Sequence, residues 1–296
     1  MRIGSFELRE PLPELRRPHV IASLRPWVDA GSVGSISLAR LERHMGAQDL
    51  GSLATPGTYY DFTRYRPVQY YEDGQRHFTI PNTHVRYAKG QGDSDFIFLH
   101  LLEPHTLAEE FIDSVADLLR HLKPERYCRV GGMYDAVPHT RPLLVMGTLD
   151  GEGLTGIQGV NPRRRSPYQG PTSIMNLVTE RISDLGVENM MLMVRLPQYV
   201  QLEEDHTGAS RLLNVLCSLY DFPSELTVSR RGQRQYERVS TQMEQDPVVK
   251  ALVSQLEKDY DDHTEEAPTE EGAPPASLPP SVEEFLRDLD KQERDS

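Results

Sequence analysis

Two hydrophobic periods alternate along the first 225 residues of the chain. Short runs in which nearly every residue is apolar are typical of buried strands. Between them, segments with an apolar residue every three or four positions are typical of helices with one buried face. The predicted strands are His19–Leu24, Phe96–Leu102, Tyr127–Gly131, Leu143–Leu149 and Met190–Leu196. The predicted helices cover residues 31–45, 107–122, 171–185 and 208–220.

This alternation predicts an α/β fold with three layers, in which a mostly parallel mixed sheet lies between two layers of helices. Strands buried on both faces, each followed by a helix, are the signature of a parallel sheet. Residues 49–90 interrupt the pattern because they are rich in Tyr, Thr and Pro. We expect them to add an antiparallel hairpin or an irregular flap.

The character of the chain changes after residue 225. We expect an α/β domain over 1–225, a helical extension over 226–263, a disordered acidic and Pro-rich linker over 264–280, and a short amphipathic helix with a tail over 281–296. The extension carries an apolar stripe, and the stripe predicts self-association because it needs a surface to cover it. Its members are Val248, Val249, Leu252, Val253 and Leu256.

The predicted C-terminal helix has apolar residues at i, i+3, i+4 and i+7. These are Val282, Phe285, Leu286 and Leu289. So short a helix is not stable in water by itself. It is therefore expected to dock on a surface, either of its own chain or of a partner protein.

The net charge of −13 is unevenly distributed. Residues 257–296 hold 14 acidic and 4 basic side chains, so the remaining chain is nearly neutral. A nearly neutral body argues against nucleic-acid binding, which needs a basic face. The chain has no run of 18 apolar residues and no apolar stretch near its start, so we expect a cytoplasmic protein without a membrane segment. Its two cysteines, Cys128 and Cys217, are expected to be buried thiols.

The most informative stretch is residues 131–142, where Pro138 and Pro142 flank His139 and Arg141. Each proline fixes its own φ and biases the preceding residue toward extended backbone, so the stretch predicts a rigid arm. The guanidinium of Arg141 suits a bidentate carboxylate pair, with Asp29 or Asp135 as expected partners. Asp29 could pair with either His139 or Arg141 across the strand ends, and it is equally well interpreted as an ordinary N-cap.

A second candidate site lies where three arginines precede a predicted helix. Arg163 and Arg165 belong to this run, and the segment from Tyr168 through Gly170 to Pro171 follows it. Pro171 is suited to the first position of the helix. Guanidiniums beside a helix N-terminus would bind an anion; the alternative is a solvated loop that balances nearby acidic residues.

Catalytic signatures are absent from the sequence. It contains no G-x-S-x-G elbow, no H-E-x-x-H motif and no phosphate-binding loop. We therefore expect no catalytic residues, no metal and no cofactor, and the interpretation leans away from an enzyme. The alternative is a site for a nucleoside, phosphate or carboxylate at the carboxyl ends of the strands, where folds of this class place their ligands.

Five motifs in order resemble the PAC2 family, the proteasome assembly chaperone 2 superfamily, and in particular its bacterial branch. Arg25-Pro26-Trp27-Val28-Asp29-Ala30-Gly31 resembles the G-W-x-D-A-G turn, and Tyr60-Asp61-Phe62 with Arg66-Pro67 resembles Y-D-F…R-P. Residues 138–142 match P-H-T-R-P, and 168–172 resemble Y-x-G-P-[ST]. Leu196-Pro197-Gln198-Tyr199-Val200 resembles V-P-H-Y-V, which adds Tyr199 to the candidate binding residues.

The resemblance implies a fold similar to the phosphorylase/hydrolase-like architecture, used without established catalysis. Eukaryotic and archaeal members are chaperones that bind proteasome α subunits. The resemblance therefore implies a non-catalytic, oligomeric protein-binding module with a protein partner, of which a proteasome subunit is one candidate.

Overall fold

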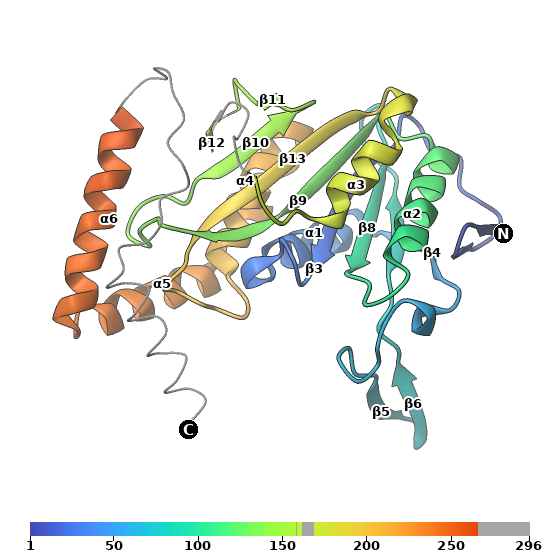
Figure 1. Ribbon diagram of the computed structural model, residues 1–296, viewed down its shortest axis with the longest axis horizontal. Coiled ribbons are helices and arrows are strands. Elements are labelled where there is room, and N and C mark those ends of the chain that lie inside the picture. The colour runs from blue at the N-terminus through green and yellow to red at the C-terminus, as the bar shows by residue number, and fades with distance from the viewer. Residues whose placement is uncertain (158, 162–168, 266–296) are drawn as a thin grey trace.

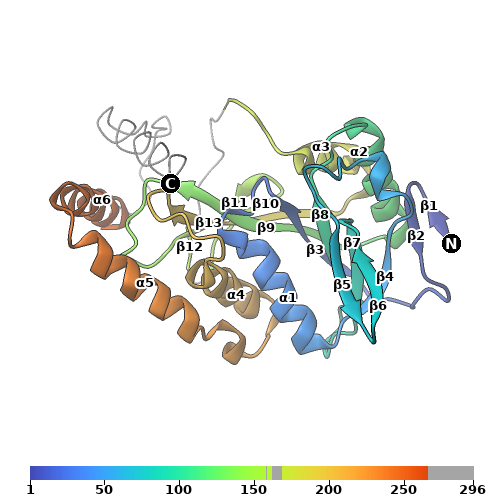
Figure 2. The same ribbon diagram turned by 90° about the horizontal axis from the view of Figure 1, so that it is seen from below.

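A mixed sheet lies between helices on both of its faces in the computed structural model, which describes residues 1–157, 159–161 and 169–265 (Figures 1 and 2). The described residues form an eleven-stranded sheet in the order β1-β2-β4-β7-β8-β3-β9-β13-β10-β11, with β12 beside β10. The four central strands β8, β3, β9 and β13 run parallel to one another. The strands are β1 (Arg2–Ile3), β2 (Phe6–Leu8), β3 (His19–Arg25), β4 (Gln48–Leu53), β5 (Val68–Glu72), β6 (Gln75–Thr79), β7 (His84–Ala88), β8 (Phe96–Leu102), β9 (Arg126–Asp135), β10 (Val145–Leu149), β11 (Glu152–Gly153), β12 (Val160–Asn161) and β13 (Glu188–Pro197).

Each face of the sheet has its own hydrophobic core, because two helices pack on it. On one face, α2 and α3 bury Phe111, Val115 and Val178 among the side chains of the sheet. On the other, α1 and α4 bury Leu38 and Leu212. The described helices are α1 (Val33–Met45), α2 (Ala108–Leu122), α3 (Ile174–Arg181), α4 (His206–Tyr220), α5 (Arg230–Met243) and α6 (Pro247–Glu265), with short 3-10 turns at Ala30–Ser32, Pro56–Thr58, Ser183–Leu185 and Ser224–Thr227. The predicted three-layer fold is confirmed.

Antiparallel strands extend the sheet on both sides of the parallel centre. Within residues 49–90, β4 and β7 pair antiparallel with each other and join the sheet through β8. Strands β5 and β6 pair only with each other among the described residues. They form a hairpin that projects from the body (Figure 1). The expected hairpin is therefore present, and the N-terminal pair β1–β2 is an addition that the hydrophobic pattern did not indicate.

The third hydrophobic cluster lies where α6 packs against the chain's own body. Val249, Val253 and Leu256 are buried against Tyr199, Val200 and Val239. Val248 lies outside this interface and is exposed, so its place in the predicted stripe was wrong. The stripe is covered within the chain. Self-association stays a prediction, but the stripe no longer gives a reason for it.

Pro171 does not open a helix, contrary to the prediction. Helix α3 begins at Ile174, and the Ser173 side chain accepts a hydrogen bond from the Met175 N–H at 3.2 Å. A serine at the N-cap satisfies one of the free N–H groups of the first turn. Both cysteines are buried, as expected. Within the described ranges, no helix is long and apolar enough to cross a membrane.

Candidate functional site

The candidate residues are gathered at the edge of the sheet where the parallel strands end. Strands β3, β9 and β13 run in the same direction, so their carboxyl ends meet there. Residues 136–142, which we call the arm, follow β9, and residues 198–205 follow β13. The turn after β3 lies against β9 through a bridge between Asp29 and Gly132. The structure separates the candidates into two clusters at this edge, one around His139 and one around Asp29.

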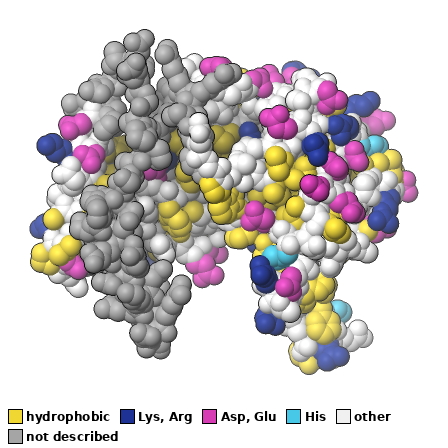
Figure 3. Space-filling model, viewed as in Figure 1, with side chains coloured by type: hydrophobic (Ala, Val, Ile, Leu, Met, Phe, Trp, Pro, Cys, Tyr) yellow, Lys and Arg dark blue, Asp and Glu magenta, His cyan; other side chains and the backbone are white. Residues whose placement is uncertain are grey.

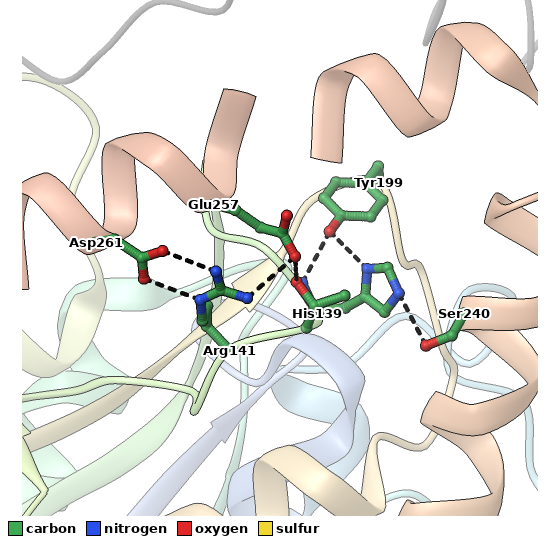
Figure 4. A network of polar contacts seen from close by, with 7 residues as sticks. His139, Arg141, Tyr199, Ser240, Glu257 and Asp261 are labelled. Atoms are coloured by element: carbon green, nitrogen blue, oxygen red, sulfur yellow. Dashed lines mark hydrogen bonds and ion pairs between the residues drawn. The ribbon is translucent and has the colours of Figure 1, made fainter. Parts of the chain in front are cut away.

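His139 and Tyr199 form the centre of the first cluster (Figure 4). The Tyr199 hydroxyl accepts a hydrogen bond from the His139 backbone N–H at 2.8 Å and lies 2.8 Å from His139 Nδ1. Nε2 lies 3.2 Å from the hydroxyl of Ser240 on α5, which donates to the Tyr236 carbonyl. One set of protons satisfies all four contacts: Tyr199 donates to Nδ1, and Nε2–H donates to Ser240.

This arrangement holds His139 in its neutral form. Burial lowers the pKa of His139, and the smaller effect of Glu257 opposes it. Burial also raises the pKa of Tyr199 to about 12. Both ring nitrogens of His139 have hydrogen-bond partners within the chain, which satisfies the imidazole where it is buried.

Arg141 holds α6 against the arm (Figure 4). Its Nε and Nη2 donate to the two carboxylate oxygens of Asp261 at 2.9 and 2.7 Å, and Nη1 donates to Glu257 at 3.1 Å. The side-chain hydrogen bonds and charge of Asp261 raise the pKa of Arg141 further. The bidentate pair was predicted correctly, but the predicted partners were wrong.

Asp135 and Asp29 are unavailable to Arg141 because each has nearer donors. Asp135 accepts a hydrogen bond from Arg195 on the neighbouring strand β13 at 2.6 Å. Asp29 is buried at the start of α1, where it accepts from the Gly34 N–H and the Ser35 hydroxyl, both at 2.6 Å. Burial raises the pKa of Asp29 against the effect of these hydrogen bonds. Asp29 therefore satisfies the first turn of α1 as a capping carboxylate does, although Ser32 and not Asp29 occupies the N-cap position of that helix.

Asp205 and Tyr236 complete the second cluster and were not predicted. Asp205 accepts from the Gly208 N–H at 2.7 Å, which caps α4, and from the Tyr236 hydroxyl at 2.8 Å. Its own N–H donates to the Gly31 carbonyl at 2.7 Å. A Cβ at Gly31 would lie 2.7 Å from the Asp205 Cβ, and φ is +59° there, so only glycine fits this turn. The final glycine of the Trp27–Gly31 motif thus has a structural explanation.

A local signal could have identified Asp205, whereas none could have identified Tyr236. Asp205 directly precedes the helical period of residues 206–220, which is the position of an N-cap. Tyr236 lies 31 residues further along the chain, on a helix with few apolar residues. The hydrogen bond between Tyr236 and Asp205 depends on how α5 packs, and a local sequence pattern does not predict that packing.

The predicted anion site is only partly within the described residues. Arg163, Arg165 and Tyr168 lie outside them, while Gly170 and Pro171 are exposed ahead of α3. Val282, Phe285, Leu286 and Leu289 of the predicted docking helix also lie outside. In the part of the chain that is described, no group of three or more His, Cys, Asp or Glu residues is placed to hold a metal ion.

Comparison with known proteins identifies a family and several solved structures that this chain resembles. The PAC2 family model matches residues 23–245, a range that contains both clusters and ends just before α6. A Streptomyces avermitilis PAC2 family protein superposes with a TM-score of 0.67 at 25% identity, over 80% of this chain and 99% of that one. A search of the curated proteins finds no significant match.

Two further solved structures share the fold. A Corynebacterium glutamicum protein of unknown function has a TM-score of 0.76 at 21% identity, over 88% of this chain and 98% of that one. A Mycobacterium tuberculosis proteasome-assembly chaperone homologue has a TM-score of 0.66 at 20% identity, over 79% and 99%. The family model covers well over half of the chain, in the region that forms the three layers, and the chain therefore belongs to the PAC2 family.

Proposed function

We propose that this protein is a non-catalytic, assembly-chaperone-like module that binds a protein partner through the β5–β6 hairpin. The observation that carries the proposal is the exposed apolar surface of this hairpin. Val68 is 61% exposed, Tyr71 68% and Phe78 53%. Figure 3 shows the corresponding hydrophobic side chains on the projection at the lower right.

Apolar residues lie on both faces of the hairpin. Residues opposite each other in an antiparallel pair share a face, and Phe78 lies opposite Gln69, so Phe78 and Tyr71 share one face. Val68 and Tyr70 lie on the other face. A two-stranded hairpin is at best marginally stable in water, and contiguous exposed apolar surface of this kind marks an interaction site.

The family supplies the class of partner to test first. One relative with this fold is described as a proteasome-assembly chaperone homologue, and the resemblance of the five sequence motifs implies the same class of partner. We therefore take a proteasome α subunit as the candidate partner. The alternative of a nucleoside, phosphate or carboxylate site loses support, because His139, Tyr199, Asp29 and Asp205 already satisfy one another or the backbone at the edge where such a ligand would bind.

The test is a binding measurement with purified proteasome α subunits from the same organism. We expect the wild type to co-migrate with them in sedimentation velocity. The double variant Tyr71→Ser/Phe78→Ser should weaken binding at least about tenfold, since truncating central aromatic residues commonly costs 2 kcal/mol or more. Val228→Ser, which changes an apolar residue 67% exposed in the turn before α5, is the matched control and should bind like the wild type. A wild type that stays unbound contradicts the choice of partner, and equal binding by the hairpin variant contradicts the role of the hairpin.

A further inference from the structure

Helix α5 exposes a row of arginines that take no part in the two clusters described above. Arg231, Arg234 and Arg238 follow one another at spacings of three and four residues, so they lie on one side of the helix. We call these three residues the arginine face. With Glu237 they line an open depression of about 590 Å³. Helix α5 lies on the outer side of α4 (Figure 2), and all three arginines are exposed.

Two of the three charges of the arginine face have no carboxylate partner among the described residues. Arg231 pairs with Glu204 at 2.9 Å, and Arg238 donates from Nε to the backbone carbonyl of Arg234. Among the residues that the structure describes, the Arg234 guanidinium has no carboxylate within salt-bridge distance. Counting Arg230, α5 holds four arginines and one glutamate in a protein whose net charge is −13.

We propose that the arginine face is the docking site of this chain's own acidic C-terminal segment, residues 266–296. That segment holds nine acidic and three basic side chains. Its sequence predicts a helix over 281–290 with Val282, Phe285 and Leu289 on one side and Glu283 and Glu284 beside them. The methylene groups of arginine side chains offer apolar surface, and their guanidiniums bind carboxylates. The arginine face can therefore contact both the apolar side and the acidic side of such a helix.

The length of the chain is compatible with docking in the same molecule. From Arg234 to the end of α5 is nine residues, and α6 is 19 residues long. At 1.5 Å per residue the two helical spans add up to about 42 Å, and residues 244–246 between them add about 10 Å, so the distance would be at most roughly 50 Å if the helices were collinear. They are not collinear (Figure 1), which shortens the distance. Residues 266–280 reach about 45–50 Å when extended, so the predicted helix can reach the arginine face.

Tethering favours the segment over a free acidic ligand. A covalent linker of this length gives an effective concentration near the millimolar range, which raises the occupancy of a weak charged site without any new contact. Nucleic acid is the other polyanion that such a face could bind. The body outside residues 257–296 is itself slightly acidic, which disfavours that ligand.

Chymotrypsin digestion of the full chain tests the proposal. Phe285 is the only aromatic residue in 266–296, so release of residues 286–296, followed by mass spectrometry, reports access to the segment. Cleavage tracks the population of the undocked segment when docking is fast. We expect cleavage of the wild type to be about tenfold slower than that of a synthetic peptide of residues 266–296, and the protection to be lost at high salt.

Charge variants assign the protection to the arginine face. Arg234→Glu/Arg238→Glu should abolish it, whereas Arg2→Glu/Arg9→Glu, with the same change in charge at the opposite end of the sheet, should retain it. Adding Glu283→Arg/Glu284→Arg to the first variant should restore protection, measured against a peptide with the same two changes. None of the three pairs of substitutions adds or removes an aromatic residue. Glu283 and Glu284 directly precede Phe285, so the variant that changes them is compared only with the peptide that carries the same changes.

Four results would overturn the proposal. The first is a wild type cleaved as fast as the free peptide, and the second is equal loss of protection in the Arg2/Arg9 variant. The third is protection that rises with protein concentration, which assigns the segment to a second copy. The fourth is a DNA oligonucleotide that binds the wild type but not Arg234→Glu/Arg238→Glu and leaves tail cleavage unchanged, which assigns the face to nucleic acid.

Discussion

At the scale of single residues, the burial of His139 makes folding sensitive to pH. Burial holds the pKa of His139 below its ordinary value of 6.5. Between these two pKa values the unfolded chain binds a proton that the folded chain does not, so stability falls as pH decreases through this range. The contribution of neutral His139 is fully present above pH 6.5 and declines below it.

We expect the stability advantage of the wild type over His139→Asn to shrink as pH falls from 7.5 to 5. Urea denaturation of both proteins at several pH values measures this difference. His19, His84 and His206 also have pKa values lowered by burial, but they are present in both proteins and cancel in the difference. A difference that stays constant over the range would show that His139 is protonated equally in the folded and unfolded chains.

Residue chemistry could be predicted from the sequence only where the partners are close along the chain. Asp29 accepts a hydrogen bond from the first turn of a helix that begins four residues later, and the sequence allowed a capping interpretation. Arg141 was expected to pair with a carboxylate, but Asp261 lies 120 residues away, on a helix whose position no local pattern records. Burial of both ring nitrogens of His139 likewise depends on where α5 and the segment after β13 pack.

At the scale of elements, α6 acts as a clamp on the arm, because it contributes both Asp261 to Arg141 and Leu256 to the cluster around Tyr199. Leu256→Ala removes buried methyl groups and should lower the free energy of opening α6 by about 2–5 kcal/mol. Val248→Ala changes an exposed residue of the same helix and should alter it by about 0.5 kcal/mol or less.

Hydrogen exchange measures both variants residue by residue. In Leu256→Ala, exchange should accelerate in residues 247–262 and in the arm, while β3 and β9 keep the protection of the wild type. Acceleration spread evenly through the central strands would show instead that α6 unfolds only together with the body.

The elements that could be predicted are those whose burial produces a clear pattern of apolar residues in the sequence. The run at Phe96–Leu102 is buried along nearly its whole length, and its bounds were predicted without error. Helix α5 buries only Gly232 and Val239, so its sequence resembles that of a solvated segment. Strands β4 and β7 have mixed burial and are defined by pairing with distant strands, which a local pattern cannot predict.

At the scale of the whole molecule, the structure separates an internal polar network from an exposed apolar hairpin. The carboxyl edge at β3, β9 and β13, where α/β proteins commonly bind small ligands, is occupied by internal hydrogen bonds and covered by α5 and α6. The hairpin carries the exposed apolar surface, and residues beside it in the chain contact the end of β8, where the Tyr60 hydroxyl donates to the Leu102 carbonyl. This division predicts that small ligands fail to stabilise the protein and that a protein partner succeeds.

A thermal-denaturation screen with nucleosides, inorganic phosphate and dicarboxylates tests the first half of that statement. A ligand present at 100 times its Kd adds about 2.7 kcal/mol to the free energy of unfolding. In a chain of this size that corresponds to a rise in Tm of roughly 5–10 °C. We expect no rise beyond the scatter of replicates at 5 mM of each compound. A reproducible rise that disappears in His139→Asn would place a ligand at the carboxyl edge and restore the small-molecule alternative. A rise that persists in that variant would place the ligand elsewhere on the protein and leave the internal network as described.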